Sequence, residues 1–334
     1  MAARVWTIAV TLRRRSAAGL SPRRCLRVAA AGARLGIRRA HAPCPQYDGR
    51  RSDRPRRAPA GPAGVRPRPG IAFVTTPASL DGLVLSSAGC RLLGALHRAA
   101  GDERLPAVLL LHGIPGHEKN LDLAVELRDR GVHVLHIHYR GSWGSEGNYS
   151  LTHLLPDACA ALEWLAALPF VDPARIALVG ISLGGWLALA LAGQAEGVLA
   201  VVSLSPLLDP ARRPLLPEEA AEFAASLNGT RADQLRQEWA ALMPVHAFAS
   251  RLAGMPILLV TAGCDSFFPP EHYSRLPAEL ARVTHVRFPR ADHVFSDVRP
   301  GLRHVVCQWL LERFDSRAAD GLSPAAIGDN PGRL

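Results

Sequence analysis

Lysine is nearly absent from this chain of 334 residues. Lys119 is the only lysine among 39 basic residues, and all the others are arginines. We attribute this bias to coding composition and not to a functional demand for cations. Residues 1–68 also lack a long apolar run, since their longest, residues 5–12, is far too short to span a bilayer. The sequence therefore predicts no stable insertion into a membrane.

Closely spaced cysteines are missing as well. The six cysteines lie far apart without a Cys-x-x-Cys pair, and four of them lie in apolar segments. They are Cys25, Cys44, Cys90, Cys159, Cys264 and Cys307. This spacing predicts buried thiols and no disulfides. It favours a reducing compartment, and we expect the protein in the cytoplasm.

Acidic residues are scarce at the N-terminus. Residues 1–60 hold 15 arginines against Asp48 and Asp53, a charge of +13. The net charge of the whole chain is +10, so the remaining residues together carry −3. Because the basic charge belongs to this segment, the sequence predicts no nucleic-acid groove on the folded part.

The composition divides the chain into three parts. Arginine, alanine, proline and glycine dominate residues 1–68, which we interpret as a disordered N-terminal extension or as translated sequence upstream of the true start. An arginine-rich, acid-poor start is also typical of a mitochondrial presequence, so the mitochondrion is the alternative location. Residues 69–315 are expected to form one α/β domain, and residues 316–334 a flexible C-terminal tail.

Short apolar runs and helical segments alternate along the domain. The runs predict strands at residues 71–75, 83–87, 91–97, 107–111, 132–139, 176–179, 198–203, 257–261 and 285–288. Helices are expected at residues 121–130, 151–168, 186–191, 270–282 and 299–314. Asp81-Gly82 and Ala88-Gly89 predict turns that make the first strands antiparallel.

The alternation of strands and helices predicts a mainly parallel central sheet of about eight strands with helices on both faces. The span from residue 205 to 254 interrupts this alternation with several prolines. We interpret residues 206–254 as a small helical insertion that forms a cap over the edge of the sheet.

Residues 175–190 have the pattern of a strand, a tight turn and a helix, with Ser182 at the turn. A nucleophilic serine must stand clear of its own backbone, which requires a sharp and strained turn. A side chain at Gly180 or Gly184 would collide with the neighbouring strand or the helix start. The N–H of Leu183 lies at the helix N-terminus, where it can stabilise an oxyanion. These features indicate a nucleophile at Ser182.

A serine hydroxyl needs a base to take its proton, and the base needs an acid to orient it. In this type of sheet both partners follow later strands. Asp265 follows the strand at 257–261, and His293 follows the strand at 285–288. The order of Ser182, Asp265 and His293 along the chain is the one that this architecture requires, so we predict them as nucleophile, acid and base.

Other residues of the same types are weaker candidates. Asp292 neighbours His293, and adjacent side chains usually diverge, so we interpret it as a turn former. Asp209, which follows an earlier strand, is a weaker rival. Ser203 and Ser205 lack the flanking glycines that a nucleophile needs here.

The loop after residues 107–111 is expected to supply a second oxyanion donor, the N–H of Ile114. We interpret His112 as a structural residue that holds this loop by a side-chain hydrogen bond. The remaining histidines of this region are His117, His133, His136 and His138. Neither a carboxylate nor a cysteine cluster accompanies them, so we predict neither a metal site nor a cofactor.

Four aromatic residues follow the strands whose ends form the expected active-site rim. They are Trp143, Tyr149, Phe267 and Phe268. They could line a pocket for an acyl group or a substrate side chain. Packing between loop and sheet is an equal alternative.

With these residues in view, the chain resembles the α/β-hydrolases, and within them the prolyl-oligopeptidase-like and serine-aminopeptidase-like branch. The resemblance covers about residues 80–314 and rests on the segments 112–116, 138–147, 180–185, 263–269 and 292–295. It implies an α/β-hydrolase fold, with Ser182 as nucleophile, Asp265 as acid and His293 as base. Prolyl oligopeptidases proper carry a β-propeller before the catalytic domain, and the basic, proline-rich segment 1–68 cannot form one.

The resemblance implies a serine hydrolase that cleaves a carboxylic ester through an acyl-enzyme, without cofactor or metal. A small peptide or aminoacyl amide, as cleaved by aminopeptidases and acylaminoacyl-peptidases, is the alternative substrate. A non-catalytic binding protein of the same fold is the alternative from another class. The expected partner is a small-molecule ester or peptide, and the sequence predicts no oligomeric state.

Overall fold

The computed structural model describes residues 76–273, 280 and 282–321, with side chains up to residue 317. The predicted N-terminal extension, the predicted strand at 71–75 and residues 322–334 lie outside the described residues. None of the helices in the described part of the chain combines the length and apolar character that a bilayer span requires.

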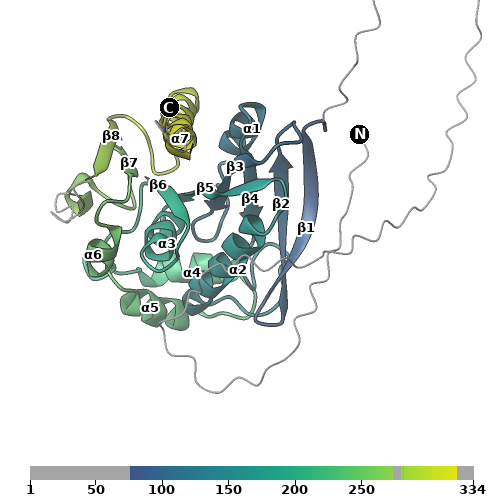
Figure 1. Ribbon diagram of the computed structural model, residues 1–334. Coiled ribbons are helices and arrows are strands. Elements are labelled where there is room, and N and C mark those ends of the chain that lie inside the picture. The colour runs from purple at the N-terminus through teal and green to yellow at the C-terminus, as the bar shows by residue number, and fades with distance from the viewer. Residues whose placement is uncertain (1–75, 274–279, 281, 322–334) are drawn as a thin grey trace, which may run out of the picture. The chain divides into compact units, whose positions relative to one another are not determined.

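An eight-stranded sheet forms the centre of the domain, with the order β1-β2-β4-β3-β5-β6-β7-β8 (Figure 1). Its strands are β1 Ser79–Ser87, β2 Cys90–Arg98, β3 Leu105–Leu111, β4 His133–Ile137, β5 Val171–Ile181, β6 Val198–Leu204, β7 Ile257–Ala262 and β8 Val283–Phe288. β2 pairs antiparallel with β1 and β4, and all other pairs are parallel. The predicted, mainly parallel sheet is therefore confirmed.

The predicted turn at Asp81-Gly82 is wrong. Both residues lie inside β1, where Asp81 pairs with Leu96 and Gly82 with Ala95. β1 is an edge strand whose leucines Leu83 and Leu85 pack inward, and this burial overrides the weak local turn signal. The turn at Ala88-Gly89 is confirmed, because both residues have positive φ between β1 and β2, as tight hairpins require.

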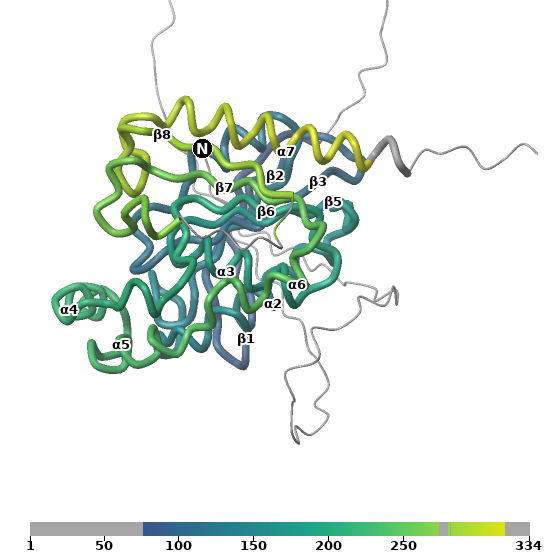
Figure 2. Tube along the Cα trace, turned by 90° about the vertical axis from the view of Figure 1, so that its left-hand side faces the viewer, coloured from purple at the N-terminus to yellow at the C-terminus, as the bar shows by residue number. Residues whose placement is uncertain are grey.

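Helices cover both faces of the sheet (Figures 1 and 2). α1 (Leu121–Asp129) and α7 (Arg299–Gly321) pack on one face, and α2 (Leu154–Ala166) and α3 (Leu183–Ala192) on the other. Each face has its own apolar core. α7 continues seven residues beyond its expected end at Phe314. Of the helix expected at 270–282, the described residues show the 3-10 turn Pro270–Tyr273.

The insertion between β6 and β7 forms the cap. It contains α4 (Pro217–Ala225), α5 (Ala232–Ala241), a 3-10 turn at Val245–Phe248 and α6 (Ala249–Leu252). Apolar side chains of α4 and α5, among them Phe223, Leu235 and Trp239, join the core that α2 and α3 share with the sheet. Figure 2 shows α4 and α5 on the side of the sheet opposite α7.

Candidate active site

Ser182 occupies the turn between the central strand β5 and helix α3. Its backbone has φ 57° and ψ −121°, a strained conformation for a residue with a side chain. A hydrogen bond joins this turn to the end of the neighbouring strand β6, because the Ser182 N–H donates to the Leu204 carbonyl at 2.8 Å. The hydroxyl lines a pocket at the carboxyl end of the sheet, as expected of a nucleophile in this position.

Two glycines make this turn possible. A Cβ at Gly180 would lie 2.0 Å from the Gly184 carbonyl oxygen at the start of α3. A Cβ at Gly184 would lie 2.2 Å from the carbonyl oxygen of Leu111 at the end of β3. Both obstacles are backbone atoms that cannot move aside, which confirms the predicted reason for these glycines.

Asp265 and His293 come together on the loops after β7 and β8. The His293 Nδ1 donates to Asp265 Oδ2 at 2.8 Å. The other carboxylate oxygen accepts the N–H groups of Phe267 and Phe268, both at 2.8 Å, and the carboxylate is buried. Since Nδ1 carries the hydrogen, a neutral imidazole at His293 presents its Nε2 as an acceptor.

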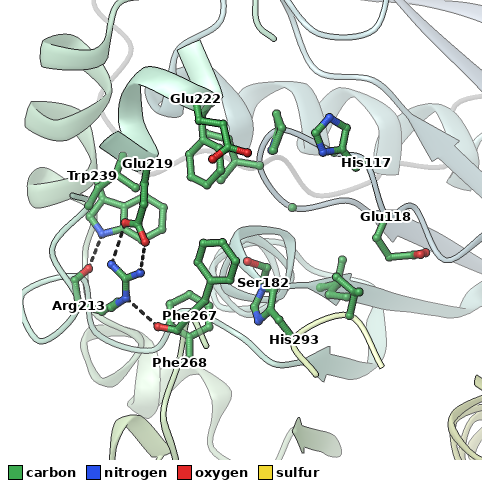
Figure 3. Close-up of a pocket in the computed structure, with 18 residues that line it drawn as sticks. His117, Glu118, Ser182, Arg213, Glu219, Glu222, Trp239, Phe267, Phe268 and His293 are labelled. Carbon is green, nitrogen blue, oxygen red and sulfur yellow. Dashed lines mark hydrogen bonds and ion pairs between the residues drawn. The ribbon is translucent and has the colours of Figure 1, made fainter. Parts of the chain in front are cut away.

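The hydroxyl of Ser182 and the imidazole of His293 line the same pocket (Figure 3). The two side chains form no hydrogen bond among the described residues. Such bonds are often long or poorly aligned without substrate and tighten when it binds. The arrangement brings all three predicted side chains to one edge of the sheet.

The rival residues are engaged elsewhere. Asp292 Oδ1 accepts the Ser296 N–H at 2.8 Å, and Asp209 Oδ1 accepts the Ala211 N–H at 3.0 Å, so both stabilise turns. Ser203 is buried and donates its hydroxyl to the Gly185 carbonyl at 3.1 Å.

The loop after β3 forms the opposite wall of the pocket, and Ile114 is part of it. The His112 Nδ1 donates to the Gly113 carbonyl at 2.7 Å, which confirms that this side chain holds the loop. Burial lowers the pKa of His112 to about 3, so the ring is neutral. The Leu183 N–H lies at the first residue of α3, beside Ser182.

The other histidines have packing and hydrogen-bonding surroundings. His133 Nδ1 accepts the Ala99 N–H at 3.1 Å, and burial lowers the pKa of His136 to about 3 and of His138 to about 4. Among the residues that the structure describes, no three His, Cys, Asp or Glu side chains are placed to hold a metal ion.

The pocket has a volume of about 250 Å³, and two of the four aromatic residues considered in the sequence analysis line it. Phe267 and Phe268 line it, and their rings lie 5.0 and 5.3 Å from the His293 ring. Trp143 and Tyr149 do not. Trp143 donates its Nε1 to the Pro115 carbonyl at 2.7 Å and covers the outside of the loop after β3, while Tyr149 is fully buried in the core.

The cap supplies a wall of the pocket that the sequence analysis missed. Its lining residues are Arg213, Leu215, Glu219, Glu222, Phe223 and Trp239. Apolar residues at helical spacing in α4 indicate a buried face, but no sequence signal shows that this face meets Ser182. His117 and Glu118 of the β3 loop were also missed as lining residues.

Arg213 joins the cap to the loop that carries Asp265 (Figure 3). Its guanidinium donates to the Phe267 carbonyl at 2.7 Å and to both carboxylate oxygens of Glu219. The carbonyl of Arg213 accepts the Trp239 Nε1–H at 2.7 Å. One residue thus connects α4, α5 and the Asp265 loop.

Residues 120–316, more than half of the chain, match the sequence profile of the prolyl oligopeptidase family. The chain belongs to the prolyl oligopeptidase family. It is therefore a hydrolase of the esterase- and peptidase-like α/β-hydrolase class, in agreement with the resemblance seen in its motifs.

Two relatives of this member of the prolyl oligopeptidase family carry different descriptions. An uncharacterised protein of Mycobacterium tuberculosis is 34% identical over 208 residues, which cover 61% of this chain and 68% of the relative. The α/β-hydrolase domain-containing protein WAV2 of Arabidopsis thaliana is 27% identical over 248 residues, covering 68% and 78%.

Solved structures share the fold of this prolyl oligopeptidase family member. Est1E of Butyrivibrio proteoclasticus, with bound ferulic acid, superposes with a TM-score of 0.60 at 21% identity and covers 70% of this chain and 99% of its own. Acetyl xylan esterase 1 from Thermoanaerobacterium superposes with a TM-score of 0.53 at 20% identity, covering 72% and 86%. At such identities the likeness concerns the fold.

Proposed function

We propose that this protein is a serine hydrolase that cleaves a carboxylic ester through an acyl-enzyme, with Ser182 as nucleophile, His293 as base and Asp265 as acid. One observation carries the proposal: a serine on a strained turn shares a pocket with an imidazole whose Nδ1 donates to a buried carboxylate at 2.8 Å. Each group has the surroundings that its role needs.

The proposed reaction begins when Ser182 Oγ attacks the carbonyl carbon and its proton passes to His293 Nε2. Asp265 holds the ring through Nδ1 and stabilises the imidazolium. The N–H groups of Ile114 and Leu183 would bind the tetrahedral oxyanion. Collapse of this intermediate expels the alcohol, which takes the proton from His293. Water, deprotonated by the same imidazole, then attacks the acyl carbon, and Ser182 Oγ leaves with that proton as the acid is released.

The alternative substrate is a small peptide or aminoacyl amide. The name of the family supports an amide, because prolyl oligopeptidases cleave peptides by their description. Est1E with ferulic acid bound supports an ester, since an ester of that acid would release it. We favour the ester, because an alcohol leaves more readily than an amine and the pocket of about 250 Å³ admits a small group.

The proposal is tested on the full-length protein with p-nitrophenyl butyrate and a fluorophosphonate probe. We expect hydrolysis by the wild type and a loss of roughly 10⁴-fold or more in kcat for Ser182→Ala. Ser86→Ala, at an exposed serine of β1, is the matched control. The probe should label Ser182 alone. Folded wild-type protein that neither hydrolyses esters or aminoacyl amides nor takes up the probe would support the non-catalytic binding protein instead.

We further propose the cytoplasm as the compartment, with the mitochondrion as the alternative. The wide spacing of the six cysteines in the sequence supports a reducing environment.

A further inference from the structure

More acidic than basic side chains line the pocket. Arg213 is its one arginine, and all three guanidinium nitrogens are engaged, by Glu219, by the Phe267 carbonyl and by the Pro214 carbonyl at 2.7 Å. Burial raises the pKa of Glu219, but the hydrogen bonds from Arg213 and from the Leu216 N–H outweigh it and keep the pKa below its ordinary value. The ion pair of Arg213 and Glu219 is therefore closed to a charged ligand.

Glu222 is different. It lies one turn further along α4 and lines the pocket, with its carboxylate pointing into the space across from Ser182 (Figure 3). It forms neither a hydrogen bond nor an ion pair with any residue in the described part of the chain. A carboxylate without a counter-charge on the wall of a pocket attracts a cation and repels an anion.

The surroundings of Glu222 strengthen this preference. The aromatic side chains of Phe223, Trp239 and Phe267 line the same pocket. Aromatic faces attract ammonium groups and repel carboxylates through the ring quadrupole. They also offer apolar surface to the body of a ligand.

Glu118 adds negative charge on the other wall. It accepts the Asn120 N–H, forms an ion pair at 3.9 Å with Arg299 Nη2, which Asp122 shares, and also interacts electrostatically with Lys119, so its charge is only partly free. The side chains of the pocket thus combine an apolar, aromatic interior with acidic groups at two sides.

We propose that Glu222 is a specificity-determining residue, and that the substrate of this pocket carries an ammonium group on an apolar or aromatic body, as in esters or amides of hydrophobic amino acids and amines. The Glu222 carboxylate binds the ammonium group while the aromatic side chains hold the body. A substrate of the same shape with a carboxylate in place of the ammonium is excluded. The substrate class named here rests on the proposed hydrolysis. The binding of an ammonium group by Glu222 does not depend on it.

The test compares three ligands of similar size as competitive inhibitors of p-nitrophenyl butyrate hydrolysis by the full-length protein: 2-phenylethylammonium, 2-phenylethanol and phenylacetate. In the wild type we expect the ammonium compound to bind roughly three- to tenfold more tightly than the alcohol, and phenylacetate to bind most weakly. In Glu222→Gln, the ammonium compound and the alcohol should bind equally. High salt should reduce the preference of the wild type, because it screens the charge.

Glu218→Gln is the matched control. Glu218 lies one turn before Glu222 on the same helix, and both side chains are exposed, but Glu218 does not line the pocket. This variant should keep the ammonium preference. Equal inhibition by the ammonium compound and the alcohol in the wild type would refute the inference, and so would a preference that Glu222→Gln retains or that Glu218→Gln also loses.

Binding and hydrolysis can fail separately. Calorimetric titration of Ser182→Ala with the same three ligands measures the ammonium preference without turnover. If that preference is present but no ester or amide is hydrolysed by the wild type, the proposed function fails and the binding site stands. If turnover occurs, the ratio of kcat/KM for phenylalanine methyl ester to that for methyl 3-phenylpropanoate should fall several-fold in Glu222→Gln, and an unchanged ratio would contradict the substrate class.

Discussion

The two nitrogens of His293 have different partners, and this difference defines what the ring can do. Nδ1 donates to the buried Asp265 carboxylate, whose second oxygen is occupied by two backbone N–H groups. The carboxylate therefore cannot rotate, and the ring is fixed in one tautomer. Its Nε2 stays available to take a proton in the pocket.

Replacement of the acid tests this arrangement. We expect Asp265→Asn to lower kcat by roughly 10³- to 10⁴-fold with little change in KM, because an amide at this position stabilises the wrong tautomer of His293. The matched control is Asp292→Asn, which changes an adjacent carboxylate that accepts the Ser296 N–H. Steady-state kinetics of both variants decide the question, and an equal loss in Asp292→Asn would reassign the acid.

The residues around Ser182 show how far a sequence defines a site. Ser182, Asp265 and His293 could be placed because each follows a strand, and the carboxyl ends of parallel strands meet at one edge. Trp143 and Tyr149 also follow a strand, yet they turn to the loop surface and to the core. Rotamer and loop packing decide where an aromatic side chain points, and neither is encoded in strand order.

At the scale of elements, the junction of β5 and α3 depends on the absence of side chains. The start of α3 passes so close to β5 and to the end of β3 that only hydrogen atoms fit at Gly180 and Gly184. This close approach holds Ser182 at the top of the central strand.

A methyl group at this junction should be costly. We expect Gly184→Ala to lower the free energy of unfolding by about 1–3 kcal/mol or more, since its Cβ meets the Leu111 carbonyl at 2.2 Å. Gly82→Ala is the control, because a Cβ at this position in β1 meets no atom within 4 Å. Urea denaturation measures both. Similar stability of the two alanine variants would show that the junction has more room than the structure gives it.

The elements themselves differed in how well the sequence predicted them. The apolar runs inside β3, β5, β6 and β7 are buried and nearly continuous in sequence, so burial and sequence agree there. β1 contains Asp81-Gly82, a pair of residues that is typical of turns. Only the pairing of β1 with β2 shows that the backbone stays extended at these two residues. The cap was predicted as helical, but the positions of Arg213 and Glu222 in the pocket wall depend on how the cap packs, which no periodicity reveals.

At the scale of the whole molecule, buried imidazoles tie stability to pH. Burial and, secondly, Arg128 lower the pKa of His97 to about 4, and burial acts similarly on His112, His136 and His138. Neither nitrogen of His97 has a hydrogen-bond partner in the described part of the chain. An unfolded histidine titrates near 6.5. Between pH 6.5 and 4 the unfolded chain therefore binds more protons than the folded one.

It follows that the free energy of unfolding falls as the pH drops from about 6.5 to about 4. Each such imidazole contributes a slope of up to about 1.4 kcal/mol per pH unit in this window. His97→Leu removes one of them without breaking a hydrogen bond, so we expect a shallower slope by about that amount and no loss of stability at pH 7. Urea denaturation at a series of pH values measures the slopes, and identical slopes in both proteins would contradict the assignment.

The residues proposed to react and those proposed to select the substrate lie on separate stretches of this chain. The groups proposed to react lie on the loops after β3, β5, β7 and β8, whereas the pocket wall that faces them comes from the cap between β6 and β7. Exchanging the cap for one of another length would give a chimera that binds different substrates while the reacting atoms keep their positions. Duplicated copies of such a gene can diverge by the same route, one segment at a time.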